Sequence, residues 1–134
     1  MNFMRIFFAL ALTTMSVATA EPPTKNPPKC LAGQLTTSWY CLENRMMANG
    51  KPMRCLESTA ASNLLPLGMR LRLTHSTPEM DYIVVVRITD RGPFILGRTL
   101  DVSQGAARLL HMETQGVACL EAEVLRPGPQ GANP

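Results

Sequence analysis

Several features that often identify a protein class are missing from this 134-residue sequence. Its net charge at pH 7 is only +3, and its Lys and Arg residues do not form a basic run. A nucleic-acid-binding protein needs a concentrated positive surface to neutralise phosphates, so we predict no nucleic-acid partner. Aromatic residues make up 5% of the chain. Beyond residue 20 the aromatic residues are Trp39, Tyr40, Tyr82 and Phe94.

No apolar run is long enough to cross a membrane. The N-terminal run extends from Ile6 to about Val17, short of the ~20 residues that a spanning helix needs. It follows Arg5 and ends in the small residues 18–20, an order typical of a secretory signal peptide. We predict a signal peptide over residues 1–20 and an exported protein, periplasmic or secreted, with no membrane span after signal cleavage.

The four cysteines form neither a CxxC pair nor a cluster with histidine. Those patterns are typical of zinc sites, so we predict no metal site. All four lie beyond residue 20, where an exported chain forms disulfides by default. Three pairings are open to four cysteines. We favour Cys41 with Cys55, closing a loop after the first strand, and Cys30 with Cys119, tying the N-terminal segment to the last strand.

Proline-rich segments bound a single predicted domain. Residues 21–32 are expected to be a linker, because four prolines precede Cys30 in this polar segment. Residues 127–134 hold three prolines and two glycines and are expected to be a disordered tail. No internal repeat interrupts residues 33–126, which we predict to be one domain.

Residues 82–89 are an almost unbroken run of apolar and β-branched side chains. Such a run is typical of a strand covered on both faces or closed into a barrel. Val84, Val86 and Ile88 share one face, and Asp90 follows in the same parity. Gly92-Pro93 then ends the strand. The pattern predicts that the carboxylate of Asp90 lies at the mouth of a barrel.

The other predicted elements are short. Strands are expected over residues 35–40, 70–73, 98–102 and 118–124, with Cys119 on the outer face of the last strand. We expect a helical turn over residues 58–62 and a helix over 104–111 that is capped by Ser103 or Asp101. Residues 43–55 and 74–81 are expected to be loops.

Four motifs carry a family resemblance. They are GQLTTSWY at 33–40, ANG at 48–50, STAASNLLPLGMRLRLT at 58–74, and TDRGPF followed by RTLDVS within 89–103. Together they resemble the RlpA-like double-psi β-barrel family, over roughly residues 33–125. The resemblance implies an all-β fold, a six-stranded double-psi β-barrel with one or two short helices. It also implies an endolytic lytic transglycosylase that cleaves peptidoglycan glycan strands and needs no cofactor.

In this family one carboxylic acid protonates the glycosidic oxygen and then acts as base while the sugar closes an anhydro ring. The resemblance places that catalytic role on Asp90. We expect Trp39, Tyr40, Arg91 and Arg98 to bind substrate. Trp39 and Tyr40 point to opposite faces of a regular strand, so one is expected in the core and the other free to stack on a sugar. A cation close to Asp90 would favour its ionised form.

The sequence departs from the family pattern at two positions. Active members carry an aspartate eight residues before the histidine of TAAH, and an ungapped alignment places Arg54 and Ser62 at these positions. Neither residue supplies a comparable acid or base. The alternative function is therefore a catalytically silent barrel that binds cell-wall glycan, as expansins do, or a protein partner. We expect Arg54 to pair with Glu57, one helical turn away.

The remaining polar residues are expected to be structural. His75 and His111 are predicted on the surface or in loops, and Asp101 is predicted to pair with Arg87 or to cap the next helix. The segment before Cys30 has no lipobox, so the exported protein is predicted to be soluble. The sequence gives no indication of its oligomeric state.

Overall fold

The structure is a computed structural model that describes residues 27–125. The predicted signal peptide, half of the predicted linker (residues 21–26) and the predicted tail lie outside the described residues. No helix within residues 27–125 is long and apolar enough to cross a membrane.

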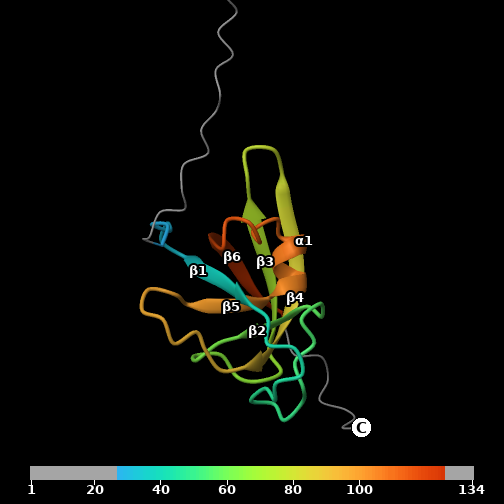
Figure 1. Ribbon diagram of the computed structural model, residues 1–134. Coiled ribbons are helices and arrows are strands. Elements are labelled where there is room, and N and C mark those ends of the chain that lie inside the picture. Colours follow the sequence, from blue (N-terminus) through green and yellow to red (C-terminus); the bar gives the residue numbers. More distant parts are fainter. Residues whose placement is uncertain (1–26, 126–134) are drawn as a thin grey trace, which may run out of the picture.

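Six strands close into a barrel in the order β1-β5-β2-β4-β3-β6 (Figure 1). The elements are β1 (Gln34–Tyr40), β2 (Thr59–Ala61), β3 (Arg70–Ser76), β4 (Asp81–Asp90), β5 (Leu100–Ser103), α1 (Gln104–Leu109) and β6 (Val117–Leu125). The pairs β1–β5 and β2–β4 are parallel, and the other four are antiparallel. The predicted six-stranded barrel with a short helix is confirmed.

Alternating side chains fill the barrel. Val84, Val86 and Ile88 of β4 point inward, and Leu71 and Leu73 of the adjacent strand β3 lie beside Val86 and Val84 on the same inner face. Each of these five side chains is at most 7% exposed. Burial of a side chain of this size contributes roughly 1.5–3 kcal/mol, so the alternation read from the sequence identifies the main stabilising contacts.

The helix α1 covers the interior next to β4 and β1. Ser103 caps it, since its Oγ accepts a hydrogen bond from the Ala106 amide. Glu113 holds the outer side of the helix by accepting hydrogen bonds from Gln104 and Arg108. The hydrogen bond from Arg108 lowers the pKa of Glu113.

Both favoured disulfides are present. Cys30 is bonded to Cys119 of β6, with their Cα atoms 5.3 Å apart, and Cys41 is bonded to Cys55, with Cα atoms 5.2 Å apart. The first bond fastens the N-terminal segment to the outside of the barrel, and the second closes the loop after β1. Closing a loop of about 15 residues stabilises a fold by ~3 kcal/mol through the entropy of the unfolded chain.

The helical turn predicted over residues 58–62 is wrong. Residues 59–61 form β2, which is buried between β4 and β5. A strand of three residues is too short to show an alternating pattern, and its small side chains also suit a helical turn. Backbone hydrogen bonding to both neighbours, which exists only in the closed barrel, selects the strand.

Two further expectations about β3 are wrong. The predicted connection after residue 73 is strand as far as Ser76, because the β3–β4 pairing continues to the pair of Ser76 with Asp81. His75 is consequently buried at 8% exposure, and its Nδ1 lies 2.7 Å from the carbonyl oxygen of Leu110. His111 is exposed and stacks on Tyr82.

The alternation of apolar and polar residues runs along the whole of β6, but only its first half has buried side chains. Ala118 and Leu120 are buried, and Cys119 points outward as predicted. Ala122 and Val124 have the same parity but are exposed. The pairing of β6 with β1 ends at Glu121, so the last residues of β6 have a partner on β3 alone.

We predict that Gly105→Ala destabilises the barrel although alanine favours helix. A Cβ at this position would lie 2.6 Å from the carbonyl carbon of Leu56, which belongs to the backbone and has little room to move. We expect a loss of about 2 kcal/mol or more in the free energy of unfolding, measured by urea denaturation. Leu109→Ala, at an exposed position of the same helix, is the control and should change this free energy by about 1 kcal/mol or less.

Candidate functional site

Asp90 lies at the last position of β4, at the end of the barrel opposite the β3–β4 hairpin (Figure 1). It keeps the parity of Val86 and Ile88 but is only half-buried, because the strand leaves the barrel here. A register shift in β2 pairs Ala61 with Asp90. The predicted placement of this carboxylate at the barrel rim is therefore confirmed.

Three donors hold the carboxylate of Asp90. Its Oδ1 accepts hydrogen bonds from the backbone amides of Ala48 and Arg91, each at 2.9 Å. Its Oδ2 accepts one from the hydroxyl of Tyr40 at 3.1 Å. A carboxylate oxygen offers about two lone-pair sites, so Oδ2 is the oxygen that retains capacity for a further partner.

An open pocket of about 330 Å³ adjoins Asp90. Its wall is mostly apolar and aromatic with a few charged groups, which is the composition typical of small-ligand sites. The lining residues are Tyr40, Leu42, Arg45, Met46, Met47, Met53, Asp90, Arg91 and Phe94. Asp90 is the only carboxylate among them, so a ligand in this pocket meets one acidic group.

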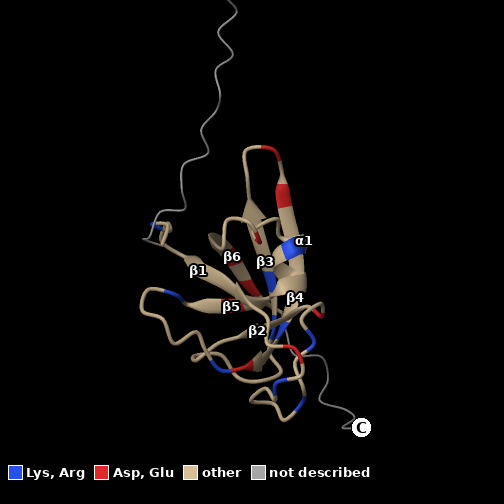
Figure 2. Ribbon diagram, viewed as in Figure 1, with Lys and Arg blue, Asp and Glu red and all other residues tan. Residues whose placement is uncertain are grey.

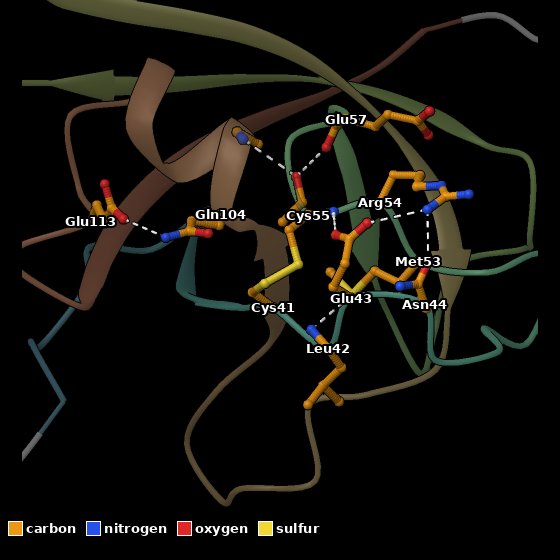
Figure 3. Close-up of a disulfide and its surroundings, with 12 residues drawn as sticks. Cys41, Leu42, Glu43, Asn44, Met53, Arg54, Cys55, Glu57, Gln104 and Glu113 are labelled. Atoms are coloured by element: carbon orange, nitrogen blue, oxygen red, sulfur yellow. Dashed lines mark hydrogen bonds and ion pairs between the residues drawn. A yellow bond between two sulfur atoms is a disulfide. The ribbon is translucent and has the colours of Figure 1, made fainter.

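The loop over residues 41–55 supplies most of the pocket wall. The Cys41–Cys55 disulfide closes its base, and Glu43 accepts a hydrogen bond from the Cys55 amide at 2.7 Å (Figure 3). Met47 and Met53 form a small core under this loop, against which Tyr40 packs. These contacts bring the amide of Ala48 to Asp90, so the loop both builds the pocket and orients its carboxylate.

Trp39 and Tyr40 point to opposite faces, as predicted. Trp39 packs against the main core, and its Nε1 donates to the carbonyl oxygen of Glu113 at 3.0 Å. Tyr40 reaches the pocket and Asp90. The structure thus brings Tyr40 to the site and places Trp39 away from this pocket.

Of the two arginines predicted to bind substrate, Arg91 lies at the pocket and Arg98 does not. Arg91 lines the pocket, while its NH1 donates to the carbonyl oxygens of Ser62 at 2.9 Å and Leu65 at 2.6 Å. Arg98 precedes β5 and is absent from the pocket wall. Within residues 27–125 neither arginine forms an ion pair with Asp90.

The residues that replace the family's other acid and histidine have structural partners. Arg54 donates to Asn44 at 2.7 Å and pairs with Glu43 at 3.4 Å (Figure 3), so the expected pair with Glu57 is wrong. The Cys41–Cys55 disulfide and the backbone hydrogen bond from the Asn44 amide to the Met53 carbonyl fold the loop back, which brings Glu43 close. Ser62 accepts hydrogen bonds on its Oγ from the Leu64 and Leu65 amides and thereby caps a turn.

Asp101 accepts a hydrogen bond from the hydroxyl of Ser38 on the adjacent strand β1. The expected pairing with Arg87 is wrong. Asp101 belongs to β5, which lies between β1 and β2 in the barrel, whereas Arg87 lies on the outer face of β4. Ser103, the other capping candidate, caps the helix.

Sequence reasoning missed the methionines and Arg45 of the pocket wall. They belong to a loop without periodicity, and the one available signal was the favoured Cys41–Cys55 pairing, which requires the loop to fold back on its own start. The donor at Ala48 is a backbone amide, which every residue except proline carries. No side-chain pattern could have indicated it.

The match to a known family agrees with this geometry. A profile of the family described as lytic transglycolase matches residues 32–122. The chain belongs to the lytic transglycolase family. A member from Nostoc sp., named probable endolytic peptidoglycan transglycosylase RlpA, is 36% identical over 124 residues, covering 85% of this chain and 33% of the relative.

Two more family members carry similar names. The probable endolytic peptidoglycan transglycosylase RlpA of Aquifex aeolicus is 37% identical, over 81% of this chain and 47% of its own length. The endolytic peptidoglycan transglycosylase RlpA of Campylobacter jejuni is 32% identical, over 84% of this chain and 42% of its own length. The chain thus spans a third to a half of the length of these relatives.

A solved structure shares the fold. The Streptomyces papain inhibitor superposes with a TM-score of 0.56 at 19% identity, over 69% of this chain and 93% of the inhibitor. At this identity the likeness shows the fold alone.

We predict that Tyr40 makes unfolding depend on pH in the alkaline range. Burial, and then the nearby charge of Asp90, raise the pKa of Tyr40 well above its ordinary value of 10.0. The unfolded chain therefore loses this proton first, and the stability that Tyr40 contributes is complete below pH ~10 and falls as the pH rises further. Urea midpoints measured from pH 8 to 11 should fall in the wild-type protein and fall less in Tyr40→Phe.

Tyr82→Phe is the matched control for that comparison, because Tyr82 lies at the far end of β4 and stacks on His111. Its midpoints should follow those of the wild-type protein. Equal slopes for Tyr40→Phe and the wild-type protein would contradict the role assigned to the Tyr40–Asp90 contact.

Proposed function

We propose that this chain acts on peptidoglycan as an exported lytic transglycosylase that cleaves glycan strands to anhydro-ended products. The observation that carries the proposal is the carboxylate of Asp90, held at the barrel rim beside an open pocket by three hydrogen bonds. Membership of the lytic transglycolase family and the names of the RlpA relatives support this substrate class.

One carboxyl group is sufficient for the proposed reaction. Protonated Asp90 gives its proton to the glycosidic oxygen while the bond from that oxygen to C1 breaks. The C6 hydroxyl of the same sugar then attacks C1 and returns a proton to Asp90, which closes the anhydro ring without water. We assign the transfer to Oδ2, because Oδ1 already accepts two backbone amides.

Tyr40 and Arg91 are proposed to contact the sugar. Tyr40 presents a half-buried ring in the pocket wall, and an aromatic face suits a pyranose. Arg91 keeps N–H donors beyond those that its NH1 uses at the Ser62 and Leu65 carbonyls. The expected roles of Trp39 and Arg98 in substrate binding stay predictions.

The proposed location outside the cytoplasm is supported by the disulfides. Both pairs, Cys30–Cys119 and Cys41–Cys55, join segments that hold the barrel and the site loop in place. Stable disulfides form in oxidising compartments such as the periplasm or the extracellular medium.

We predict that Asp90→Asn abolishes cleavage. Purified protein incubated with peptide-free glycan should release anhydro-ended oligosaccharides detectable by mass spectrometry, and the variant should do so at least ~100-fold more slowly, as loss of an acid–base group implies. Asp81→Asn, at the exposed other end of β4, is the control and should retain wild-type activity. Absence of product from the wild-type protein at high loading would end the enzyme proposal.

A second candidate function is binding without cleavage. It is favoured by the contacts of Arg54 and Ser62, which replace an acid and a histidine that active members carry. Arg54 is engaged with Glu43 and Asn44, and Ser62 caps its own turn. In that case the Asp90 pocket recognises a glycan or a protein partner and performs no chemistry.

The double variant Arg54→Asp with Ser62→His separates the two candidates. If the protein is an active transglycosylase, we expect the double variant to release anhydro products at a rate within about ten-fold of the wild-type rate, because Asp90 is unchanged. A silent wild-type protein that gains activity in the double variant would support the binding function. Urea denaturation of the variant is needed alongside, since it loses the Ser62 cap and places a second carboxylate near Glu43.

A further inference from the structure

A second pocket, of about 480 Å³, lies beside the Asp90 pocket. Met47 belongs to both walls, so the two pockets are neighbours separated by this side chain. The second pocket is lined by Met47, Asn49, Lys51, Pro52, Arg54, Glu57, Ser58, Thr59, Arg87 and Thr89. Unlike the first, it is lined mainly by polar and charged residues, with three cations against one carboxylate.

The cations of this second pocket are incompletely neutralised. Within residues 27–125 neither Lys51 nor Arg87 takes part in a salt bridge, whereas Arg54 pairs with Glu43. Arg70 lies directly opposite Arg87 in the β3–β4 pairing, and both point outward. Like charges directly opposite each other repel. Figure 2 shows several of the Lys and Arg segments at this end of the barrel.

Polar groups line the same pocket and are held in place. The Asn49 amide donates to the carbonyl oxygen of Thr89 at 3.1 Å, which docks the loop tip on β4, and Asn49 Oδ1 accepts the Lys51 amide at 3.0 Å. Thr59 is 8% exposed, and its Oγ1 is buried without a hydrogen-bond partner in the described chain. A buried hydroxyl without a partner costs free energy.

We propose that this second pocket binds an oxyanion, a carboxylate or a phosphate group. An oxyanion would relieve the repulsion around Arg87 and would accept charge-assisted hydrogen bonds from Lys51 and Arg87. Anion binding does not depend on the cleavage activity. Its consequence for the substrate rests on the proposed function: a glycan strand at Asp90 would be selected by an acidic group that the strand itself carries, a carboxylate or an attached phosphate.

The test is a nuclear magnetic resonance titration of the ¹⁵N-labelled mature chain. The probes are an acetylated dipeptide with a free carboxylate, the same dipeptide with an amidated end, and inorganic phosphate. We expect saturable shifts of the amides at residues 49–51, 57–59 and 87–89 with the carboxylate or the phosphate, and none with the amidated dipeptide. Added salt should weaken the binding.

Variants link the binding to this pocket. Arg87→Gln should raise the Kd roughly three- to ten-fold, as loss of a partly exposed charged hydrogen bond implies. Arg72→Gln is the matched control, because Arg72 lies on the adjacent strand, points outward and pairs with Glu123. Its Kd should equal that of the wild-type protein. Lys51→Gln, on the exposed loop, repeats the test should Arg87→Gln lose its folded spectrum.

The outcomes distinguish a carboxylate ligand from a phosphate ligand, and they test the anion site separately from the cleavage proposal. Saturable binding of the carboxylate alone identifies a carboxylate as the ligand group, and binding of phosphate alone identifies a phosphorylated polymer. No saturable shift with either, equal shifts with the amidated dipeptide, or an unchanged Kd in Arg87→Gln and Lys51→Gln would overturn the anion site. None of these results depends on anhydro products, so the cleavage proposal stands or fails on the glycan digest.

Discussion

Closure of the barrel by two parallel strand pairs is the constraint on which the site depends. The pairs β1–β5 and β2–β4 bring segments distant in sequence side by side, and the ends of β1 and β4 emerge at the same rim. Tyr40 is the last residue of β1, and Asp90 is the last residue of β4. The hydrogen bond between them is therefore a consequence of strand pairing, and it joins two residues that the chain separates by fifty positions.

The loop over residues 41–55 turns this rim into a pocket. Its disulfide and its small methionine core keep it folded against β1 and β4, where it supplies both an apolar wall and the Ala48 amide. The same loop forms the wall between the Asp90 pocket and the polar pocket beside it. A single short cross-linked segment thus shapes two adjacent pockets, one that contains the carboxylate of Asp90 and one that contains Lys51, Arg54 and Arg87.

The replacement of an acid by Arg54 changes both the contacts within the loop and the charge of the neighbouring pocket. An arginine needs carboxylate and amide partners, and Glu43 and Asn44 of the same loop provide them. The position thereby adds a positive charge to a pocket that Lys51 and Arg87 already line. Arg54 therefore stabilises the loop through its contacts with Glu43 and Asn44. Asp90 remains the carboxylate in the wall of the open pocket.

Sequence alone was sufficient for features with a local period or an ordered motif. The inward face of β3 and β4, the helix after Ser103, the barrel class and the rim position of Asp90 follow from such patterns. For the four cysteines the sequence left three pairings open, and the favoured pairing is the one present. Tertiary structure decided the rest. A three-residue strand has no period, so β2 exists only through its neighbours. The choice of Tyr40 over Trp39, the burial of His75 and the partner of Arg54 depend on which segments the closed barrel brings together, and no local pattern encodes those distances.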